Sequence, residues 1–364
     1  MKVNKNATFL VSTLGGGGAE GVCVNVANGL AEDGWDIDLV VLNLNNAVYL
    51  KRVSDKVNLV VLEVNNARYS FWKLRNYLLT NKPSKVLVFN YELAIILVLV
   101  RIFFKLEFML IARNINTISQ VKKNAKGSWR KQALMQMLTK LYSKSDLIIN
   151  QCKKMESDLL MELPDLNGKT CVIYNPVNKL VEDTISNLEL GSVAKENYLL
   201  CVGRLVPQKG FNFAIEAFSK LTKSHSHLRL KIVGGGGLEA ELKEYAKALG
   251  IADKVDFEGF REDIIPYFLN ARATLLPSLY EGFPNVLVES ITLGTPVIAF
   301  DCQSGPSEIV QNKNGLLTPY MNVEKFISDI EQVLSLEWNP LNVSNSLLNL
   351  RTNKIIAEYE KILL

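Results

Sequence analysis

Short apolar runs alternate with helical patterns along the chain, and this alternation constrains the fold more than any other feature. Runs rich in Val, Ile and Leu are typical of buried strands, and a helix after each of them predicts parallel pairing. The alternation ends near residue 173 and restarts near residue 198, which predicts two similar α/β units in tandem. The predicted strands are 7–13, 36–42, 57–62, 85–89, 108–111, 146–149 and 170–173, followed by 198–202, 228–233, 255–257, 273–276, 296–299 and 315–317.

The domain borders follow from the polar segment between the two series of strands. Asn175-Pro176-Val177-Asn178 opens a segment that runs to Asn197 and is predicted to be an interdomain linker. We expect a first domain over 1–178, a second over 179–343 and a final helical segment over 344–364. A chain of 364 residues that is 48% hydrophobic can fill two cores.

Composition excludes several classes of protein. The five cysteines are scattered without a C-x-x-C pair, which argues for reduced thiols in a cytoplasmic protein and against a disulfide or zinc framework. The net charge of +4 is too mild to indicate nucleic-acid binding. The residues from Met1 lead directly into a strand, which predicts no signal peptide. The apolar stretch 93–104 contains Arg101 and lies between two predicted strands, so a buried crossover helix is favoured over a re-entrant or membrane-surface segment.

The strand predicted at 273–276 is followed by a Gly/Pro loop and a helix, the arrangement of an α/β ligand site. Pro284 suits the first helical position, so Phe283 is the expected cap and the amides of residues 285–287 are expected to face a ligand. Glu281 lies in the loop, and Glu289 lies about 7 to 8 Å further along the helix axis. Two carboxylates at this spacing around a helix N-terminus suit an elongated polyhydroxylated ligand that carries phosphates.

The spacing of Glu281 and Glu289 is E-x7-E, and with Glu-Gly-Phe-Pro inside it the stretch resembles that of retaining GT-B glycosyltransferases of the family 4-like, group 1 type. The resemblance implies two Rossmann-like domains facing a central cleft. It also implies a nucleotide-sugar donor bound mainly by the second domain, an acceptor bound mainly by the first, and a last helix that returns to the first domain. The alternative is an ordinary strand-loop-helix turn with two solvated glutamates.

A second loop supplies positive charge. Gly203-Arg204-Leu205 follows the strand predicted at 198–202, and Lys209-Gly210 comes next, before the following helix. Two cations on one loop suit a pyrophosphate leaving group, because negative charge accumulates on its oxygens as the glycosidic bond breaks. The pattern G-R-L-x-x-x-K-G resembles the phosphate-binding loop of the same family, so Arg204 and Lys209 join Glu281 as predicted catalytic residues.

The remaining donor contacts are implied by the resemblance. Gly234 opens a glycine turn that lies near the nucleotide in the family, and Phe260 or Arg261 is expected against the base, with uracil favoured. The segment 301–309 resembles a G-P-x-E motif, although a capped helix start explains it equally well. The predicted donor-binding set is Gly16, Gly17, Gly203, Arg204, Lys209, Gly234, Phe260, Arg261, Glu281, Gly282, Phe283, Pro284, Asn285, Val286 and Glu289.

In the first domain, four glycines at 15–18 separate a strand from a helix and let backbone amides approach a ligand closely. The loop lacks the Walker and G-x-G-x-x-G patterns and resembles the family loop that faces donor and acceptor; a merely tight connection is the alternative. Arg113-Asn114 follows another strand. Many relatives carry a histidine in this neighbourhood and this chain does not, which makes Arg113 and Asn114 candidates for contacting donor phosphate or acceptor, against a surface arginine at a strand end.

We predict no metal and no cofactor beyond the nucleotide-sugar co-substrate. Asp36-Ile37-Asp38 has the D-x-D form of metal-dependent transferases but begins a strand, at the wrong end of the sheet. His225 and His227 lie in a polar loop with no third ligand nearby.

A basic segment between Asn114 and Ser145 contains no acidic residue. Its helical spacing places Trp129, Leu134, Leu138 and Leu141 broadly together with basic side chains around them. Docking on an anionic membrane and a solvated face over a core stripe are both open interpretations. The candidate membrane contacts are Lys122, Lys123, Lys126, Arg130 and Lys131.

The expected function is therefore sugar transfer from a nucleotide diphosphate, with UDP favoured, to a glycan acceptor of a lipid-linked kind. Bacterial surface polysaccharide assembly in the cytoplasm, at the inner face of the membrane, is the expected setting. A non-catalytic nucleotide-sugar-binding subunit and another GT-B enzyme, such as an epimerase or a phosphorylase, are the alternatives.

Overall fold

The computed structural model describes residues 5–115, 117–119 and 129–364, and it divides into two compact units. The first unit is Met1–Asn178 with Thr352–Leu364, and the second is Lys179–Arg351. Each unit is built on one parallel sheet, and every predicted strand forms. The prediction of two Rossmann-like α/β domains is confirmed.

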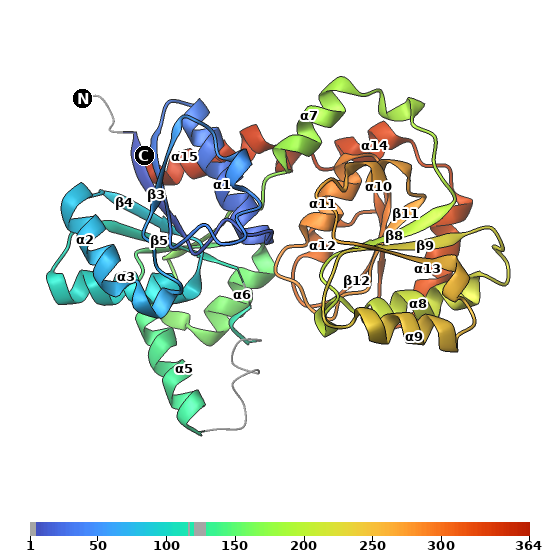
Figure 1. Ribbon diagram of the computed structural model, residues 1–364, viewed down its shortest axis with the longest axis horizontal. Coiled ribbons are helices and arrows are strands. Elements are labelled where there is room, and N and C mark those ends of the chain that lie inside the picture. Colours follow the sequence, from blue (N-terminus) through green and yellow to red (C-terminus); the bar gives the residue numbers. More distant parts are fainter. Residues whose placement is uncertain (1–4, 116, 120–128) are drawn as a thin grey trace. The chain divides into compact units, whose positions relative to one another are not determined.

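The first sheet has the order β3-β2-β1-β4-β5-β6-β7 (Figure 1). β5 continues three residues beyond the predicted strand end at residue 111, so Arg113 and Asn114 lie inside the strand rather than after it. The strands are β1 Asn6–Val11, β2 Asp36–Val41, β3 Val57–Val61, β4 Lys85–Val88, β5 Met109–Asn114, β6 Leu147–Asn150 and β7 Thr170–Val172.

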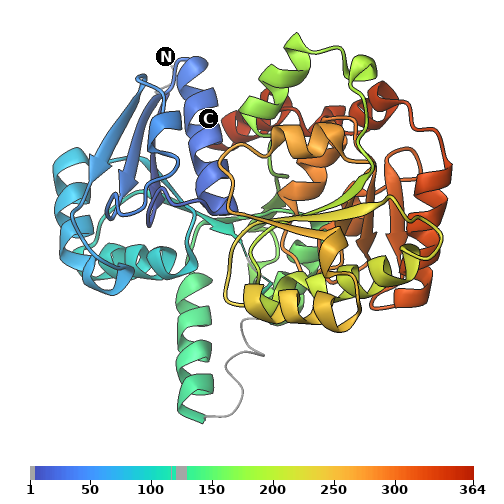
Figure 2. The same ribbon diagram turned by 45° about the vertical axis from the view of Figure 1, so that its right-hand side comes forward.

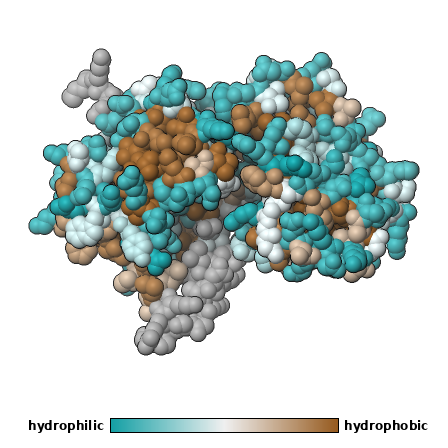
Figure 3. All heavy atoms as spheres, viewed as in Figure 1, coloured by the Kyte–Doolittle hydropathy of each residue, from teal (hydrophilic) through white to brown (hydrophobic). Residues whose placement is uncertain are grey.

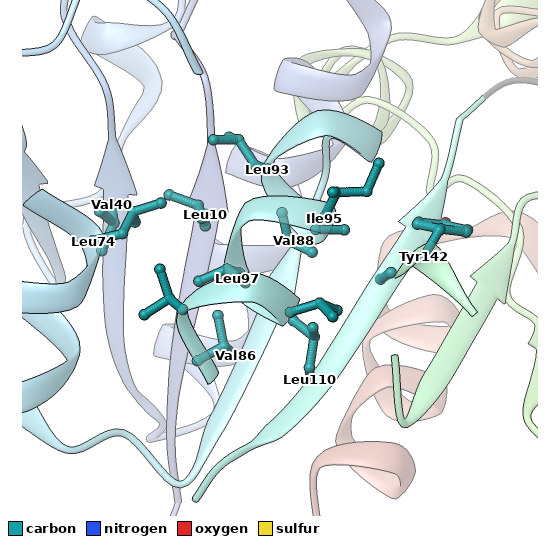
Figure 4. Packing of buried hydrophobic residues seen from close by; sticks show 14 of the residues in the cluster. Leu10, Val40, Leu74, Val86, Val88, Leu93, Ile95, Leu97, Leu110 and Tyr142 are labelled. Atoms are coloured by element: carbon teal, nitrogen blue, oxygen red, sulfur yellow. The ribbon is translucent and has the colours of Figure 1, made fainter. Parts of the chain in front are cut away.

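Helices cover both faces of this sheet, with α1 on one face and α2 and α3 on the other (Figures 1 and 2). α3 is the predicted crossover helix: Leu93 and Leu97 pack on strand residues that include Leu10, Val86 and Val88 (Figure 4). Its last turn differs, because Ile102 and Phe103 are exposed. The helices of this unit are α1 Gly18–Glu32, η1 Leu50–Arg52, η2 Ala67–Tyr69, α2 Phe71–Asn81, α3 Tyr91–Phe104, α5 Trp129–Tyr142, α6 Lys153–Glu162, η3 Pro164–Leu166 and α15 Thr352–Leu363.

The last helix, α15, packs against α1. A Cβ atom on Gly29 of α1 would lie 2.7 Å from Cδ1 of Ile356, so a larger residue there would require α15 to shift or Ile356 to change rotamer. The Glu360 carboxylate also accepts hydrogen bonds from Lys5 Nζ at 2.8 Å and Trp35 Nε1 at 3.1 Å.

The predicted final segment begins too early at residue 344. Residues 340–351 belong to the second unit, because Ser344 Oγ donates to the Thr292 carbonyl at 2.6 Å and Ser346 Oγ accepts from Asn314 Nδ2 at 2.8 Å. The returning helix starts at Thr352, whose hydroxyl donates to the Val177 carbonyl at 3.0 Å.

The second sheet has the order β10-β9-β8-β11-β12-β13, with α8, α9 and α13 packed on one face around Phe218 and Phe326. Its strands are β8 Tyr198–Val202, β9 Arg229–Val233, β10 Val255–Gly259, β11 Ala273–Leu276, β12 Val297–Phe300 and β13 Gly315–Thr318. Its helices are α7 Lys179–Asn187, η4 Leu190–Ser192, η5 Pro207–Lys209, α8 Phe211–Leu221, α9 Glu239–Ala248, η6 Ala252–Lys254, α10 Ile265–Asn270, α11 Asn285–Thr292, α12 Pro306–Ile309, α13 Val323–Ser335, α14 Pro340–Asn345 and η7 Leu348–Leu350.

The predicted polar linker contains a helix. α7 buries Val181 and carries an i, i+4 ion pair between Lys179 and Asp183 at 3.1 Å. The helix was not predicted because most of its residues are polar and only a narrow apolar stripe packs on the second unit.

Strand order reverses once in each sheet, between β1 and β4 and between β8 and β11. At such a switch point the loops after the two central strands diverge and leave a crevice for a ligand. The loops after β8 and β11 are those that carry Lys209 and Glu281. Within the described ranges, no helix is both long and apolar enough to cross a membrane.

Candidate functional site

The switch point of the second sheet joins the two predicted catalytic loops. Lys209 Nζ lies 2.7 Å from Glu281 Oε1, and the two side chains are only 14% and 7% exposed. Ser278 Oγ donates to the same carboxylate oxygen at 2.6 Å. Both of these contacts are made to Oε1 of Glu281, and neither involves Oε2. A carboxylate with one oxygen held by the protein is well placed to accept a ligand hydroxyl with the other.

Further contacts hold the two loops in register. The Leu279 amide donates to the Gln208 carbonyl at 2.8 Å, and Gln208 Nε2 donates to the Tyr280 carbonyl at 2.9 Å. Gly210 has φ +60° and a Cβ there would lie 2.2 Å from the Pro277 carbonyl oxygen, so this position requires glycine. Sequence reasoning missed Gln208 and Ser278; their only signal was their place beside Lys209 and at the start of the Glu281 loop.

The glycine turn after β9 packs on the loop after β8. A Cβ on Gly234 would lie 1.9 Å from the Gly203 carbonyl oxygen, and one on Gly236 would lie 2.4 Å from that of Leu205. Both glycines also have positive φ, at +142° and +159°. The structure therefore gives Gly234 a structural role in supporting the loop that carries Arg204, and donor contact by Gly234 stays a prediction.

Arg204 and Lys209 differ in setting. Arg204 is exposed on the loop after β8, while Lys209 is half-buried and its side chain passes Gly203, where a Cβ would lie 3.4 Å from Lys209 Cε. The two predicted cations thus share one loop, and the structure pairs one of them with Glu281.

The expected cap of α11 is wrong by one residue. Pro284 occupies the N-cap position with φ −79° and ψ 91°, and α11 begins at Asn285. The Leu287 amide donates to the Pro284 carbonyl at 3.0 Å, which removes it from the amides expected to face a ligand. Phe283 is buried in the loop, and Glu289 is half-buried one turn into the helix.

The segment 301–309 contacts the Glu281 loop. The Glu281 amide donates to the Gln303 carbonyl at 3.3 Å, and a Cβ on Gly305 would lie 2.5 Å from Pro284 Cδ. Burial, reinforced by the Glu281 charge, raises the pKa of Cys302 to about 12, so this thiol stays protonated. The segment supports Gly282, Phe283 and Pro284 in addition to starting α12.

The loop after β10 presents the residues expected near the base. Phe260 is 67% exposed, and Arg261 Nη2 donates to Glu258 Oε2 at 3.1 Å. Tyr267 OH donates to the same oxygen at 2.9 Å. Glu258 and Arg261 border a cavity of about 420 Å³ that is also lined by Lys243 and Phe257.

In the first unit, Gly17 is the N-cap of α1 and Gly16 is exposed before it. The loop adjoins the first switch point, where the Ser12 amide donates to Asn90 Oδ1 at 2.9 Å. A cavity of about 540 Å³ opens there, at the carboxyl ends of β1, β2, β4 and β5. Asparagine side chains are frequent in its lining, which contains Ser12, Thr13, Leu42, Asn43, Asn65, Asn66, Ala67, Asn90, Tyr91, Glu92, Leu93, Arg113, Asn114, Ile115, Ile118 and Tyr142.

Arg113 is not the surface arginine of the alternative reading. It is 1% exposed, donates to Asn175 Oδ1, and lies with its guanidinium 5.8 Å from the Phe89 ring centroid. Its Nε and Nη1 have no hydrogen-bond partner among the described residues. Burial lowers the pKa of Arg113. Asn114 Nδ2 donates to Asn150 Oδ1 at 3.0 Å, so both predicted residues have a side-chain partner within the first unit.

Three of the predicted membrane contacts, Lys122, Lys123 and Lys126, lie outside the described residues. Arg130 and Lys131 lie in the first turn of α5, but their side chains are not among those described. In the Asp36-Ile37-Asp38 sequence at the start of β2, Asp38 accepts hydrogen bonds from Tyr77 OH at 2.5 Å and from Asn58 Nδ2 at 2.7 Å.

Solved structures share the whole architecture. The chain aligns with Anabaena HepE, solved with UDP and glucose, at a TM-score of 0.77 and 17% identity over 99% of both chains. Two parallel-sheet domains with these neighbours define the GT-B fold.

Sequence comparisons find similarity to glycosyltransferases. Residues 185–350 match the family described as glycosyl transferases group 1. An uncharacterised glycosyltransferase of Haemophilus influenzae is 28% identical over 342 residues, 91% of each chain. A Campylobacter jejuni N-acetylgalactosamine-N,N'-diacetylbacillosaminyl-diphospho-undecaprenol 4-alpha-N-acetylgalactosaminyltransferase is 30% identical over 201 residues, 54% of this chain and 53% of that protein. The second unit therefore matches the group 1 glycosyl transferase family, and the chain is similar over most of its length to a protein named as a glycosyltransferase.

Proposed function

We propose that this glycosyltransferase moves a sugar from a UDP-sugar, with retention of anomeric configuration, to a lipid-linked glycan acceptor. The observation that carries the proposal is the Lys209–Glu281 contact of 2.7 Å at the switch point of the second sheet. A cation for the leaving group and a carboxylate for a sugar hydroxyl are held together at the place where α/β proteins bind ligands.

The chemistry can proceed on one face of the donor sugar. The bond between the anomeric carbon and the diphosphate oxygen breaks, and the acceptor hydroxyl forms the new glycosidic bond on the face that the diphosphate leaves. The proton of the acceptor hydroxyl passes to the departing phosphate oxygen, and the products are UDP and the extended glycan. This scheme needs no carboxylate nucleophile, unlike that of retaining hydrolases.

Each residue has a role in this scheme. Arg204 and Lys209 stabilise the charge that grows on the diphosphate, a task that metal ions perform in other transferases. Glu281 accepts a hydrogen bond from a hydroxyl of the donor sugar, and Glu289 binds the ribose hydroxyls. Ser278 holds Glu281 Oε1 in place at 2.6 Å.

We propose that the cavity of the first unit receives the acceptor sugar. Its carboxamide, hydroxyl and aromatic lining has the donors, acceptors and apolar faces that a sugar ring requires. Arg113 and Asn114, within β5, are among its lining residues.

Two relatives support the choice of substrates. HepE was solved with UDP, and the Campylobacter enzyme is named for transfer to a diphospho-undecaprenol acceptor. The setting that follows is assembly of a bacterial surface polysaccharide at the inner face of the cytoplasmic membrane.

The decisive experiment incubates the protein with UDP-, GDP- and ADP-sugars and a lipid-linked acceptor pool, and measures diphosphate release and product mass together. The expected result is UDP release that depends on acceptor, with a product heavier by one sugar. Nucleotide binding without release would indicate a binding subunit. A change of the donor sugar without transfer would indicate an epimerase.

A further inference from the structure

Aromatic side chains gather where α2 begins and α3 ends. The ring centroid of Phe71 lies 5.3 Å from that of Trp72 and 6.3 Å from that of Phe103, and the Trp72 and Phe104 centroids are 6.0 Å apart. The cluster is continuous, so these rings form one surface rather than scattered exposed residues.

The outer members of this cluster are in solvent. Trp72 is 64% exposed, Phe103 70% and Ile102 56%, while Tyr69 on the preceding turn η2 is 64% exposed. We call the cluster members Trp72 and Phe103, together with Tyr69 and Ile102 that neighbour the cluster in the sequence, the aromatic patch. The buried residues of the same two helices, such as Leu74 and Leu97, already fill the core, so the patch is not needed for packing.

Basic side chains surround the patch. Arg75 stacks over the Phe104 ring at 4.6 Å and Arg68 over the Tyr69 ring at 5.3 Å, while Lys73 and Lys105 are exposed beside the patch residues. Figure 3 shows brown and pale side chains interspersed with teal ones in the region of α2 and α3.

Charge is distributed unevenly along the chain. Residues 64–113, which precede the basic segment, contain eight Lys and Arg residues against two Glu, a net charge of +6 in a protein whose total is +4. The remainder of the chain is therefore acidic. Such an asymmetry favours attraction of this part of the first unit to an anionic surface.

From these observations we propose that the aromatic patch inserts into the headgroup region of an anionic phospholipid membrane. Trp and Tyr favour the membrane interface because they combine an apolar ring with a polar tip, and Lys and Arg bind anionic headgroups. The site differs from the basic segment at 122–131, which lies after α3.

The position of the patch fits the acceptor proposed above. Tyr91 and Glu92, at the start of α3, line the cavity of the first unit, and Phe103 lies near the end of the same helix. Eleven residues separate Glu92 from Phe103, a rise of about 16 Å along the helix. A glycan that is still attached to a membrane lipid therefore has a short path from the patch to the cavity.

The test measures vesicle binding without substrates, so its outcome is separate from that of the transferase assay. The full chain is sedimented with vesicles of phosphatidylglycerol and phosphatidylcholine, or of phosphatidylcholine alone. We expect binding to the anionic vesicles that weakens with added salt. The double variant W72S/F103S should lose on the order of tenfold or more in partition coefficient, because each substitution removes a ring that insertion into the membrane would take out of water. L50S, at another exposed apolar residue of the first unit, is the matched control and should bind like the wild type.

Tryptophan quenching by brominated lipid locates the contact. The chain has four tryptophans, and W72F should abolish most of the quenching while W129F should leave it. Quenching that disappears in W129F and persists in W72F would place the contact at the basic segment and overturn the proposal. Wild-type binding by W72S/F103S would also overturn the proposal. So would a wild-type protein that does not bind vesicles but forms a dimer, if the double variant is a monomer. Unchanged thermal unfolding and UDP binding of both variants would show that they are folded.

Discussion

Lys209 Nζ and Glu281 Oε1 lie 2.7 Å apart although 72 residues separate them in the chain. The pair places a cation and a carboxylate at the switch point of the second sheet, where both side chains are largely buried. Lys209→Ala and Glu281→Ala should each lower kcat/KM for transfer by well over tenfold, since each removes a group that acts on the donor. Steady-state kinetics with a UDP-sugar checks this.

Lys179→Ala is the matched control for Lys209, because Lys179 also forms an ion pair, with Asp183 at 3.1 Å, but on the exposed surface of α7. Its kcat/KM should stay within about twofold of the wild type, as expected for a surface pair. Near-normal turnover in both Lys209→Ala and Glu281→Ala would refute the assignment of the site.

Ser278→Ala should act through Glu281. The substitution removes the 2.6 Å hydrogen bond to Oε1 and leaves the carboxylate less well oriented. A hydrogen bond to a charged group contributes about 1.5 to 3 kcal/mol, so kcat/KM should fall by roughly 10- to 150-fold. Ser278→Thr, which keeps the hydroxyl, should recover part of the loss. If Ser278→Ala has full activity, Ser278 does not position the carboxylate.

Gly234→Ala and Gly236→Ala should destabilise the second unit. Each Cβ would overlap a backbone carbonyl oxygen, at 1.9 and 2.4 Å, and each glycine has positive φ. A strained backbone of this kind costs about 1 to 3 kcal/mol, which corresponds to several degrees in Tm. Gly237→Ala, where a Cβ meets nothing within 4 Å, is the control and should leave Tm nearly unchanged. Equal Tm values in all three would show that the loops relax without cost.

Thr13→Val should weaken binding of the acceptor and leave binding of the donor unchanged. Thr13 lines the cavity of the first unit, and valine keeps its shape while removing the hydroxyl. Loss of one neutral hydrogen bond costs about 0.5 to 1.5 kcal/mol, so the acceptor KM should rise by roughly 2- to 13-fold with an unchanged donor KM. A rise in the donor KM alone would place the acceptor elsewhere. Thr80→Val, on the exposed end of α2, is the control.

Gly29→Ala should lower Tm through the contact between α1 and α15. The new Cβ would lie 2.7 Å from Ile356 Cδ1, so α15 must shift or Ile356 must change rotamer. Combining Gly29→Ala with Ile356→Val should recover part of the loss, since the two side chains share one space. Strictly additive Tm changes would mean that the helices do not meet there.

The parallel α/β architecture could be predicted from the sequence because hydrophobic periodicity is a local property. Patterns among neighbouring residues predict all the strands, the division into two units and the E-x7-E stretch. Boundaries were harder to predict. α7 was hidden by its polar surface, and the segment 340–351 is held to the second unit by Ser344 and Ser346, whose partners lie far away in the chain.

The contacts of the site residues were decided only by the tertiary structure, because they depend on the order of the strands and on packing between segments that are distant in the chain. β8 lies beside β11, and no local sequence pattern predicts this pairing. The adjacency of the two strands brings Lys209 close to Glu281, whose carboxylate also accepts a hydrogen bond from Ser278. Arg113 is buried because its strand continues to Asn114 and because α15, almost 240 residues later, brings Tyr359 close to it. Side-chain chemistry is encoded residue by residue, whereas the contacts that use it arise only when the sheet is assembled.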